Sequence, residues 1–294
     1  MPKARHPYIQ TLISRIPSSM GSYEPVLTEM ETVLKDPQSN LLNLGEVIEK
    51  DPDLTARLLR LGNSSFYSFS SRLETVSEAI SLIGVEQVQD LIVASSVVEV
   101  FAGVSPEFVD MKSFWQHSIA CGIGARLLAV ARRVPKPDKF FVGGLLHDIG
   151  RLVLFSQSPQ KTQQIFQLYR SKRMLLRDAE AQVLGFNHAE IGEALLRYWG
   201  YPANLIHAVS YHHFPMAAGT FLNEAACVHV ADYLANAMQL GSSGERFIPP
   251  LQAKAWEHLN LTTDLIESVM NAIDDQTAIV QEEFLSPPRS APAA

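Results

Sequence analysis

Apolar residues recur at helical spacing along most of the chain, and the strict alternation of a half-buried strand is hard to find. Leu54, Leu58 and Leu61, for example, share one helix face between a start signal at Asp51-Pro52-Asp53 and a stop at Gly62. The same pattern predicts helices over residues 46–61, 77–83, 85–100, 114–133, 138–155, 159–172, 175–184, 188–199, 202–213, 221–239 and 251–283, the last interrupted near 260–263. The sequence therefore predicts an all-α fold.

A proline-containing connection at 104–110 divides the predicted helices into parts. Residues 10–110 form an N-terminal helical part, and residues 111–240 form a second helical part that carries most of the histidines. A C-terminal helical extension follows at 245–284. The final residues, 285–294, are poor in core-forming side chains and are expected to be disordered.

The composition is that of a protein with a well-formed core, because 47% of the 294 residues are hydrophobic and 19% are charged. The formal net charge of -7 argues against a broad basic face for nucleic acid. The N-terminus lacks the apolar segment of a secretory signal, and no stretch approaches the roughly 18 apolar residues of a membrane span. We therefore expect a cytoplasmic protein that has no membrane contact.

Residues 79–92 have the apolar and glycine spacing of a helix-turn-helix. Glu86 and Asp90, however, would bring negative charge close to DNA phosphates. We interpret this segment as helices that pack against their own domain, and DNA binding is disfavoured.

Histidine and aspartate residues interrupt the apolar stripes of several separate predicted helices. These residues are His117, His147, Asp148, His188, His212, His213 and Asp232. His117, for example, shares a helix face with Cys121 and Leu128. Burying a charge is costly unless the charge is paired or bound to metal. The residues are either hydrogen-bonded core side chains or the ligands of a metal site inside a helical bundle, and their joint pattern favours the metal site.

Imidazole nitrogens and carboxylate oxygens suit divalent ions such as Fe, Mn, Zn, Ni or Mg. The two cysteines, Cys121 and Cys227, stand far apart without a CxxC pattern. We interpret both as buried reduced thiols, and we expect no thiolate ligand near the histidines.

An ordered series of motifs resembles the HDOD domain, a branch of the HD phosphohydrolase superfamily found in bacterial signalling proteins. The motifs are DPDLTARLLRLGNSSFY at 51–67, SEAISLIG at 77–84, FWQHS at 114–118, GLLHDIGR at 144–151 and NHAEIG at 187–192. The resemblance covers about residues 10 to 240. It implies a multi-helix HD-type bundle with an N-terminal helical subdomain.

The resemblance also implies a set of metal ligands. Those of a first ion would be His117, His147, Asp148 and Asp232. Those of a second ion would be His188 and one or both of His212 and His213, with Asp148 bridging. Two divalent ions against two carboxylates leave a positive centre that suits a phosphate and activates a water. In an active enzyme the catalytic residues would be Asp148 and Arg151.

Three positions depart from the related HD-GYP enzymes, which hydrolyse cyclic di-GMP. Phe214-Pro215-Met216 follows the paired histidines where those enzymes carry Gly-Tyr-Pro, so that substrate is not expected. Ser113 stands where some of them have a glutamate, so a third metal is not expected. Arg151 replaces their lysine and could contact a phosphate, but it would not act as a movable proton donor.

Two hypotheses follow. In the first, the protein is a bacterial HDOD-type signalling protein that holds one or two metal ions and transmits its state to a protein partner through the N-terminal part. In the second, it is a metal-dependent phosphohydrolase or phosphodiesterase that takes a nucleotide or cyclic nucleotide as its phosphate ligand. Turnover that depends on both metal and Asp148 separates the two.

Overall fold

The computed structural model describes residues 6–17, 24–64, 66–67, 69, 71–101 and 103–285. Within these residues the chain is all-α, as predicted, and turns, loops and short 3-10 segments join the helices. From residue 286 onward, the tail that was expected to be disordered lies outside the described residues. None of the described helices combines the length and apolar character needed to cross a membrane.

The chain forms two compact units. The first unit contains the described parts of Met1–Ser18 and Phe101–Asp274, and the second contains those of Ser19–Val100 and Asp275–Ala294. The units therefore divide near residues 18, 100 and 274, whereas the sequence analysis divided the chain at 110 and treated 245–284 as one extension. All seven candidate ligands belong to the first unit.

The second unit is built from short helices. They are α2 (Glu24–Lys35), α3 (Leu41–Glu49), α4 (Pro52–Gly62), α5 (Val76–Ile83), α6 (Val85–Val100) and the end of α16 (Thr263–Leu285). The single helix predicted over 46–61 is wrong, because α3 ends at Glu49 and α4 begins at Pro52. Asp51 caps α4 by accepting hydrogen bonds from the backbone N–H groups of Asp53 and Leu54, and Pro52 fits the first turn, where no N–H is needed.

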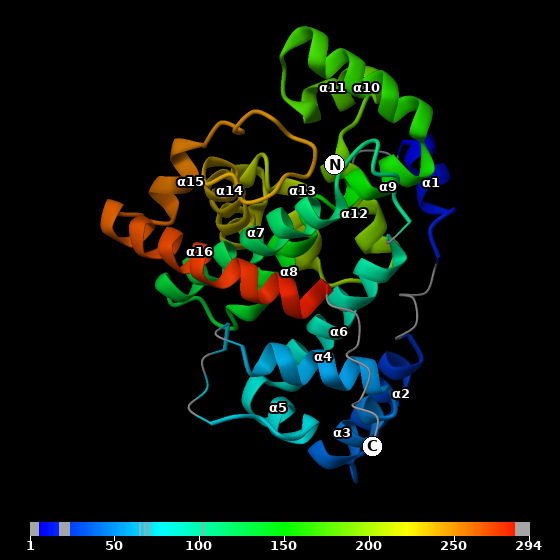
Figure 1. Ribbon diagram of the computed structural model, residues 1–294, viewed down its shortest axis with the longest axis vertical. Coiled ribbons are helices and arrows are strands. Elements are labelled where there is room, and N and C mark those ends of the chain that lie inside the picture. The colour runs from blue at the N-terminus through cyan, green and yellow to red at the C-terminus, as the bar shows by residue number, and fades with distance from the viewer. Residues whose placement is uncertain are drawn as a thin grey trace. The chain divides into compact units, whose positions relative to one another are not determined.

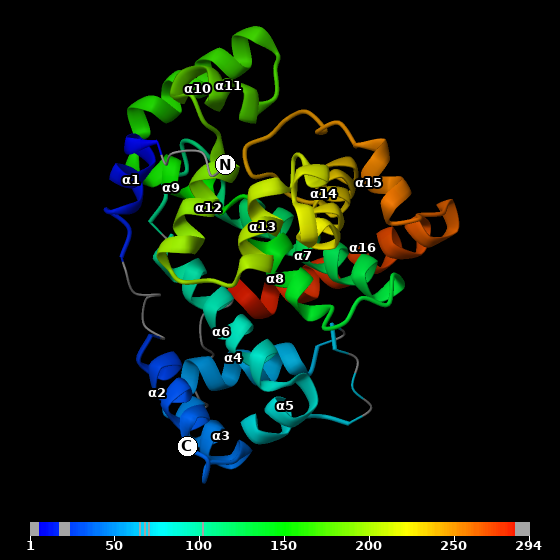
Figure 2. The same cartoon turned by 180° about the vertical axis from the view of Figure 1, so that it is seen from behind.

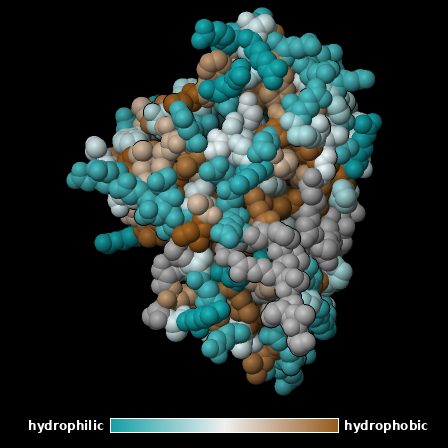
Figure 3. Space-filling model, viewed as in Figure 1, coloured by the Kyte–Doolittle hydropathy of each residue, from teal (hydrophilic) through white to brown (hydrophobic). Residues whose placement is uncertain are grey.

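The first unit contains most of the described helices (Figures 1 and 2), and the histidines belong to it. Its α-helices are α1 (Pro7–Ile13), α7 (Met111–Ala131), α8 (Asp138–Leu146), α9 (Ile149–Gln157), α10 (Pro159–Lys172), α11 (Leu176–Leu184), α12 (His188–Tyr198), α13 (Ala203–Tyr211), α14 (Leu222–Ala237), α15 (Ala253–His258) and the first part of α16. Helix α7 packs against α8 and α14 and is buried around most of its circumference, so it forms the centre of this unit. Hydrophilic residues predominate on the face of the molecule in Figure 3, with smaller hydrophobic areas between them.

The single helix predicted over 138–155 is also wrong, and the break falls at the His-Asp pair. Helix α8 ends at Leu146 and α9 begins at Ile149. Asp148 has a φ of -101° and a ψ of 11°, outside the helical region, and His147 Nδ1 donates to the carbonyl oxygen of Gly144 at 2.7 Å. Consecutive side chains of a straight helix point about 100° apart, and the break lets His147 and Asp148 face the same site.

Glycines let α9 and α12 approach closely beside the break. A Cβ on Gly150 would lie 2.0 Å from the backbone oxygen of His188 and 2.8 Å from the backbone nitrogen of Gly192. Both atoms are backbone, so neither can move away without shifting a helix.

We expect Gly150→Ala to lower the free energy of unfolding by about 3 kcal/mol, because overpacking forces such a shift. Urea denaturation followed by circular dichroism measures the change. Gly103→Ala is the control, since a Cβ there would meet nothing within 4 Å. Equal stability of the two variants would contradict the close approach.

Candidate metal centre

The structure buries all seven side chains that the sequence pattern singled out. Their relative exposures are 1% for His117, 0% for His147, 2% for Asp148, 0% for His188, 0% for His212, 4% for His213 and 4% for Asp232. They come from α7, the α8–α9 break, the start of α12, the end of α13 and α14. The packing of these helices brings the side chains into two neighbouring groups, and Asp148 forms a third, overlapping group with His147 and His212.

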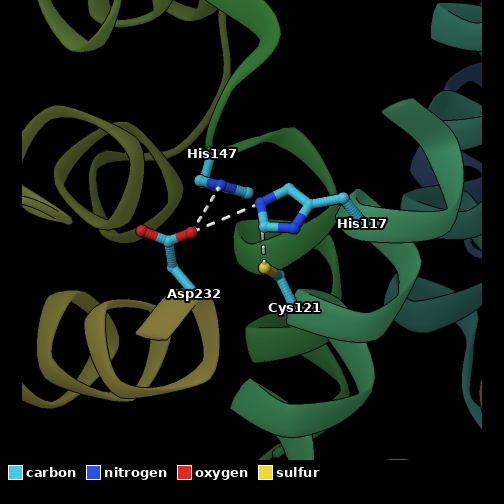
Figure 4. Close-up of side chains that lie close together, drawn as sticks. All are labelled: His117, Cys121, His147 and Asp232. Atoms are coloured by element: carbon cyan, nitrogen blue, oxygen red, sulfur yellow. Dashed lines mark hydrogen bonds and ion pairs between the residues drawn. The ribbon is translucent and has the colours of Figure 1, made fainter. Parts of the chain in front are cut away.

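The first group joins α7, α14 and the His-Asp break (Figure 4). His117 Nε2 lies 3.3 Å from Asp232 Oδ1, and His147 Nε2 lies 3.7 Å from the same oxygen. Asp232 is held in place by Asn236, whose Nδ2 donates to Asp232 Oδ1 at 2.7 Å. The carboxylate therefore presents one oxygen to two imidazoles.

The second group consists of three histidines. The Nε2 atom of His188 lies 2.9 Å from Nε2 of His213 and 3.4 Å from Nε2 of His212. Three imidazole nitrogens from the α12 start and the α13 end thus point at a common volume.

Asp148 lies between the two groups. Its Oδ1 is 3.0 Å from His188 Nε2 and 3.8 Å from His212 Nε2, while its Oδ2 is 3.3 Å from His147 Nε2. One carboxylate oxygen faces each group, which is the placement that a bridging ligand requires.

The hydrogen bonds of the outer ring nitrogens establish where the protons are. His147 Nδ1 and His212 Nδ1 each lie 2.7 Å from a backbone carbonyl oxygen, and His188 Nδ1 lies 2.6 Å from the Glu180 carboxylate. These oxygens accept hydrogen bonds only, so each Nδ1 must carry a proton. In the neutral rings, the inward Nε2 atoms then present lone pairs to one another and to the carboxylates. This arrangement is repulsive unless a cation lies between them or a ring carries a second proton on Nε2.

The buried polar atoms also fit a metal. Among the described residues, His147 Nε2 and Asp148 Oδ1 are buried without a hydrogen-bond partner. Such groups are costly to bury unless a cation compensates them. Histidines that donate their outer N–H to a carbonyl or carboxylate are typical of metal ligands. The residues present therefore fit one or two divalent ions.

Electrostatics keep the carboxylates ionised. Burial would raise the pKa of Asp148, but Arg151 and His147 outweigh it and hold this pKa well below the usual range. Burial likewise opposes ionisation of Asp232, whose pKa is nevertheless lowered to about 2 by His117 and His147. Both side chains can therefore act as anionic ligands at neutral pH.

The histidines divide into two kinds. Burial and the neighbouring imidazoles hold the pKa values of His212 and His213 well below the ordinary value, so these rings stay neutral. Burial also opposes the charge on His147 and His188, but Asp148 raises the pKa of His147 and Glu180 raises that of His188. Protons on these two rings would compete with a metal for the same nitrogens.

Glu180 on α11 is a site residue that the sequence analysis missed. It is 0% exposed and accepts hydrogen bonds from both the backbone N–H of His188 at 2.8 Å and the ring Nδ1 at 2.6 Å. A signal was present, because Glu180 interrupts the buried stripe formed by Leu176, Ala179 and Leu184. The same reasoning that selected Asp232 would have found it.

Arg151 faces the carboxylates rather than solvent. It is 2% exposed, and its guanidinium lies 3.1 Å from Asp148 Oδ2 and 3.7 Å from Glu180 Oε1. Ser243, in the glycine-serine loop, donates to Asp148 Oδ2 and accepts from Arg151. No sequence pattern singled out Ser243, because its role depends on how the loop of residues 241–244 folds back over the site.

The interpretation of the cysteines is confirmed in one respect and wrong in another. Cys121 and Cys227 are both buried free thiols, as predicted. However, Cys121 Sγ lies 3.6 Å from His117 Nε2, so a cysteine does lie beside the histidines. The i to i+4 spacing on α7 places them together.

An all-α fold with histidine and aspartate side chains converging from separate helices defines a class of helical proteins with a buried candidate metal centre. Within this class, the sequence matches the HDOD domain over residues 20–215, and the chain belongs to this family. Six of the seven candidate ligands lie inside the matched range, and Asp232 lies beyond it.

One curated relative is an uncharacterized protein of Treponema pallidum (strain Nichols). The two sequences are 26% identical over 189 residues, which is 64% of this chain and 36% of the relative. The match thus spans little more than a third of the relative's length.

Solved structures share the fold. An HDOD domain protein of unknown function from Geobacter sulfurreducens has a TM-score of 0.76 at 22% identity, covering 96% of this chain and 99% of that one. A candidate phosphohydrolase from Shewanella amazonensis SB2B has a TM-score of 0.69 at 22% identity, covering 94% and 97%. A candidate signal transduction protein from Marinobacter aquaeolei VT8 has a TM-score of 0.68 at 21% identity, covering 95% and 65%.

Proposed function

We propose that this protein is a bacterial HDOD-type signalling protein whose first unit holds one or two divalent metal ions. The observation that carries the proposal is the convergence of imidazole lone pairs and carboxylate oxygens from side chains that are at most 4% exposed. The ligands are His117, His147, Asp148, His188, His212, His213 and Asp232. A site so enclosed favours an ion that stays bound and contributes to the stability of the fold.

The metal state acts on a protein partner through the second unit, which contains most of the N-terminal part of the chain. Several large apolar side chains of this unit are solvent-exposed, among them Leu42 at 64% and Leu82 at 53%. The related fold of a candidate signal transduction protein from Marinobacter aquaeolei VT8 supports a signalling role. A partner captured by the full chain and lost on substitutions within residues 50–100 would support this role.

The alternative function is that of a phosphohydrolase acting on a nucleotide or cyclic nucleotide, and one observation favours it. A cavity of about 230 Å³ is lined by Ser242 and Gly244, which flank the Ser243 that contacts Asp148. Arg170 and Arg246 line the same cavity and offer contacts to a phosphate, while Asp110 and Glu245 in the lining balance their charge. Bound divalent ions would supply further positive charge and lower the pKa of a water. Asp148 would hold the ions as a bridging ligand, and Arg151 would keep the Asp148 carboxylate ionised.

Metal content tests the premise that both functions share. The protein is reconstituted with each candidate divalent ion, and unbound metal is then removed. We expect elemental analysis to find one or two equivalents of metal per chain. Less than about half an equivalent with every ion would contradict both functions, because a preformed site of this ligand number retains its metal.

Turnover then separates the two functions. A panel of nucleotides and phosphodiesters is incubated with metal-loaded wild type and with Asp148→Asn. Hydrolysis that requires both the metal and Asp148 would establish the enzyme and overturn a purely regulatory role. Its absence across the panel, with the metal bound, favours the signalling protein.

A further inference from the structure

We infer that Cys121 is a thiolate ligand of the metal ion held by His117, His147 and Asp232. This inference rests on the proposed metal site and adds a sulfur donor to it. Four side chains face one another in this group, and Figure 4 shows Cys121 on the same helix as His117, with its sulfur directed at the imidazole.

The distances fit a single ion at the centre of the four. Cys121 Sγ to His117 Nε2 is 3.6 Å, His117 Nε2 to Asp232 Oδ1 is 3.3 Å, and His147 Nε2 to Asp232 Oδ1 is 3.7 Å. Tetrahedral ligands at zinc bond lengths are separated from one another by about 3.3–3.8 Å. All four donor atoms lie within 4.8 Å of one another. The side chains need little movement to enclose an ion.

The backbone also fixes Cys121 in this position. A Cβ on Gly144 would lie 2.5 Å from the backbone oxygen of Cys121, so glycine allows α8 to contact α7 at this residue. Gly144 also supplies the carbonyl that holds the His147 ring. One helix contact therefore brings the thiol and the His-Asp break together.

The surroundings make hydrogen bonding alone a weak explanation for the thiol. Cys121 is 0% exposed, and in His117 the other ring nitrogen, Nδ1, is buried without a hydrogen-bond partner among the described residues. If Nε2 carries the ring proton, which Asp232 Oδ1 would accept, Nε2 has no lone pair for the Cys121 S–H; if Nδ1 carries it, that N–H lacks an acceptor. An ion between Nε2 and Sγ uses both donor atoms. On binding, the S–H bond breaks, the sulfur keeps the electron pair, and the proton is released to solvent.

A sulfur donor restricts the class of metal. Thiolate, imidazole and carboxylate together suit zinc, iron(II) or cobalt(II), whereas magnesium prefers an all-oxygen shell. Histidine and aspartate ligands alone would accept many divalent ions. With Cys121 as a further ligand, the site favours the softer ions among them, such as zinc, over magnesium.

Cobalt(II) substitution of the full chain tests the inference, because a thiolate ligand produces an intense sulfur-to-cobalt charge-transfer band in the near ultraviolet. We expect the band in the wild type and in Cys227→Ser, and its loss in Cys121→Ser and Cys121→Ala with cobalt still bound. Cys227 is the matched control, since it is the other buried free thiol and belongs to no group of candidate ligands among the described residues. We also expect Cys121→Ser to lower zinc affinity at least about tenfold and manganese affinity far less.

The outcomes separate the inference from the proposed function. If the wild type binds no cobalt, zinc or other divalent ion, the metal site itself fails. If cobalt binds without the band, or the band persists in Cys121→Ser, the thiol is no ligand and the inference is overturned. Should the Cys121 variants not fold, zinc-edge X-ray absorption of the wild type decides, because a thiolate contributes a sulfur at about 2.3 Å from zinc.

Discussion

Asp148→Asn is expected to abolish metal binding and to destabilise the first unit. Asp148 presents one oxygen to each of the two histidine groups, at 3.0 Å from His188 Nε2 and 3.3 Å from His147 Nε2. An amide keeps the shape but removes the negative charge and turns a donor toward one group. We expect less than about a tenth of the wild-type metal content, because the remaining ligands then hold each ion without their bridging anion.

The same substitution leaves the guanidinium of Arg151 buried beside a neutral amide. Breaking one partner of a buried ion pair costs about 3–5 kcal/mol, so the free energy of unfolding without metal should fall by about that amount. Elemental analysis and urea denaturation measure the two effects, and circular dichroism verifies that the variant is folded.

Asp138→Asn is the control for Asp148→Asn. Asp138 pairs with Arg126 at 2.6 Å near the surface, where an ion pair contributes about 1 kcal/mol or less. We expect full metal content and a small change in stability. A folded Asp148→Asn protein that retains as much metal as this control would show that Asp148 does not bridge.

Glu180→Gln is expected to weaken metal binding by about 10- to 100-fold, although Glu180 is not itself among the candidate ligands. The carboxylate fixes the ring of His188 through Nδ1 at 2.6 Å and its backbone N–H at 2.8 Å. Both bonds go to the same oxygen, Oε2, which the amide of glutamine can replace, but glutamine loses the charge that polarises the ring and pairs with Arg151. We expect the free energy of unfolding to fall by about 2 kcal/mol as well, because two hydrogen bonds to a charged acceptor become weaker bonds to a neutral one. Zinc titration against a competing chelator measures the affinity.

Glu190→Gln is the matched control, because Glu190 lies on the same helix as His188. Its carboxylate accepts a hydrogen bond from the backbone N–H of Asn187 at 3.0 Å and completes the capping box of α12. Glutamine can serve in a capping box, so the metal affinity should change less than about threefold. Similar affinity losses in both variants would mean that Glu180 acts only through the stability of α12.

The spacing of apolar residues was sufficient to predict an all-α protein and most of its helices. It failed where local interactions break a helix without changing the apolar pattern. Asp51 with Pro52 starts a new helix inside the predicted segment 46–61, and His147 with Asp148 ends one inside 138–155. The first break could have been predicted from the cap signal, whereas the second depends on the bond from His147 to the Gly144 carbonyl.

The sequence by itself determined which side chains would be buried in the candidate centre, because each polar residue interrupts an apolar helical face. All seven candidate ligands are buried, and Glu180 obeys the same rule. Only the tertiary structure decided how they are grouped. The close contact at Gly144 places the backbone of Cys121 beside α8, and the close contact at Gly150 places the start of α12 beside α9. The fold of the loop of residues 241–244 brings Ser243 to Asp148. Periodicity encodes which face of a helix is buried, but the relative positions of atoms on different helices depend on how those helices pack.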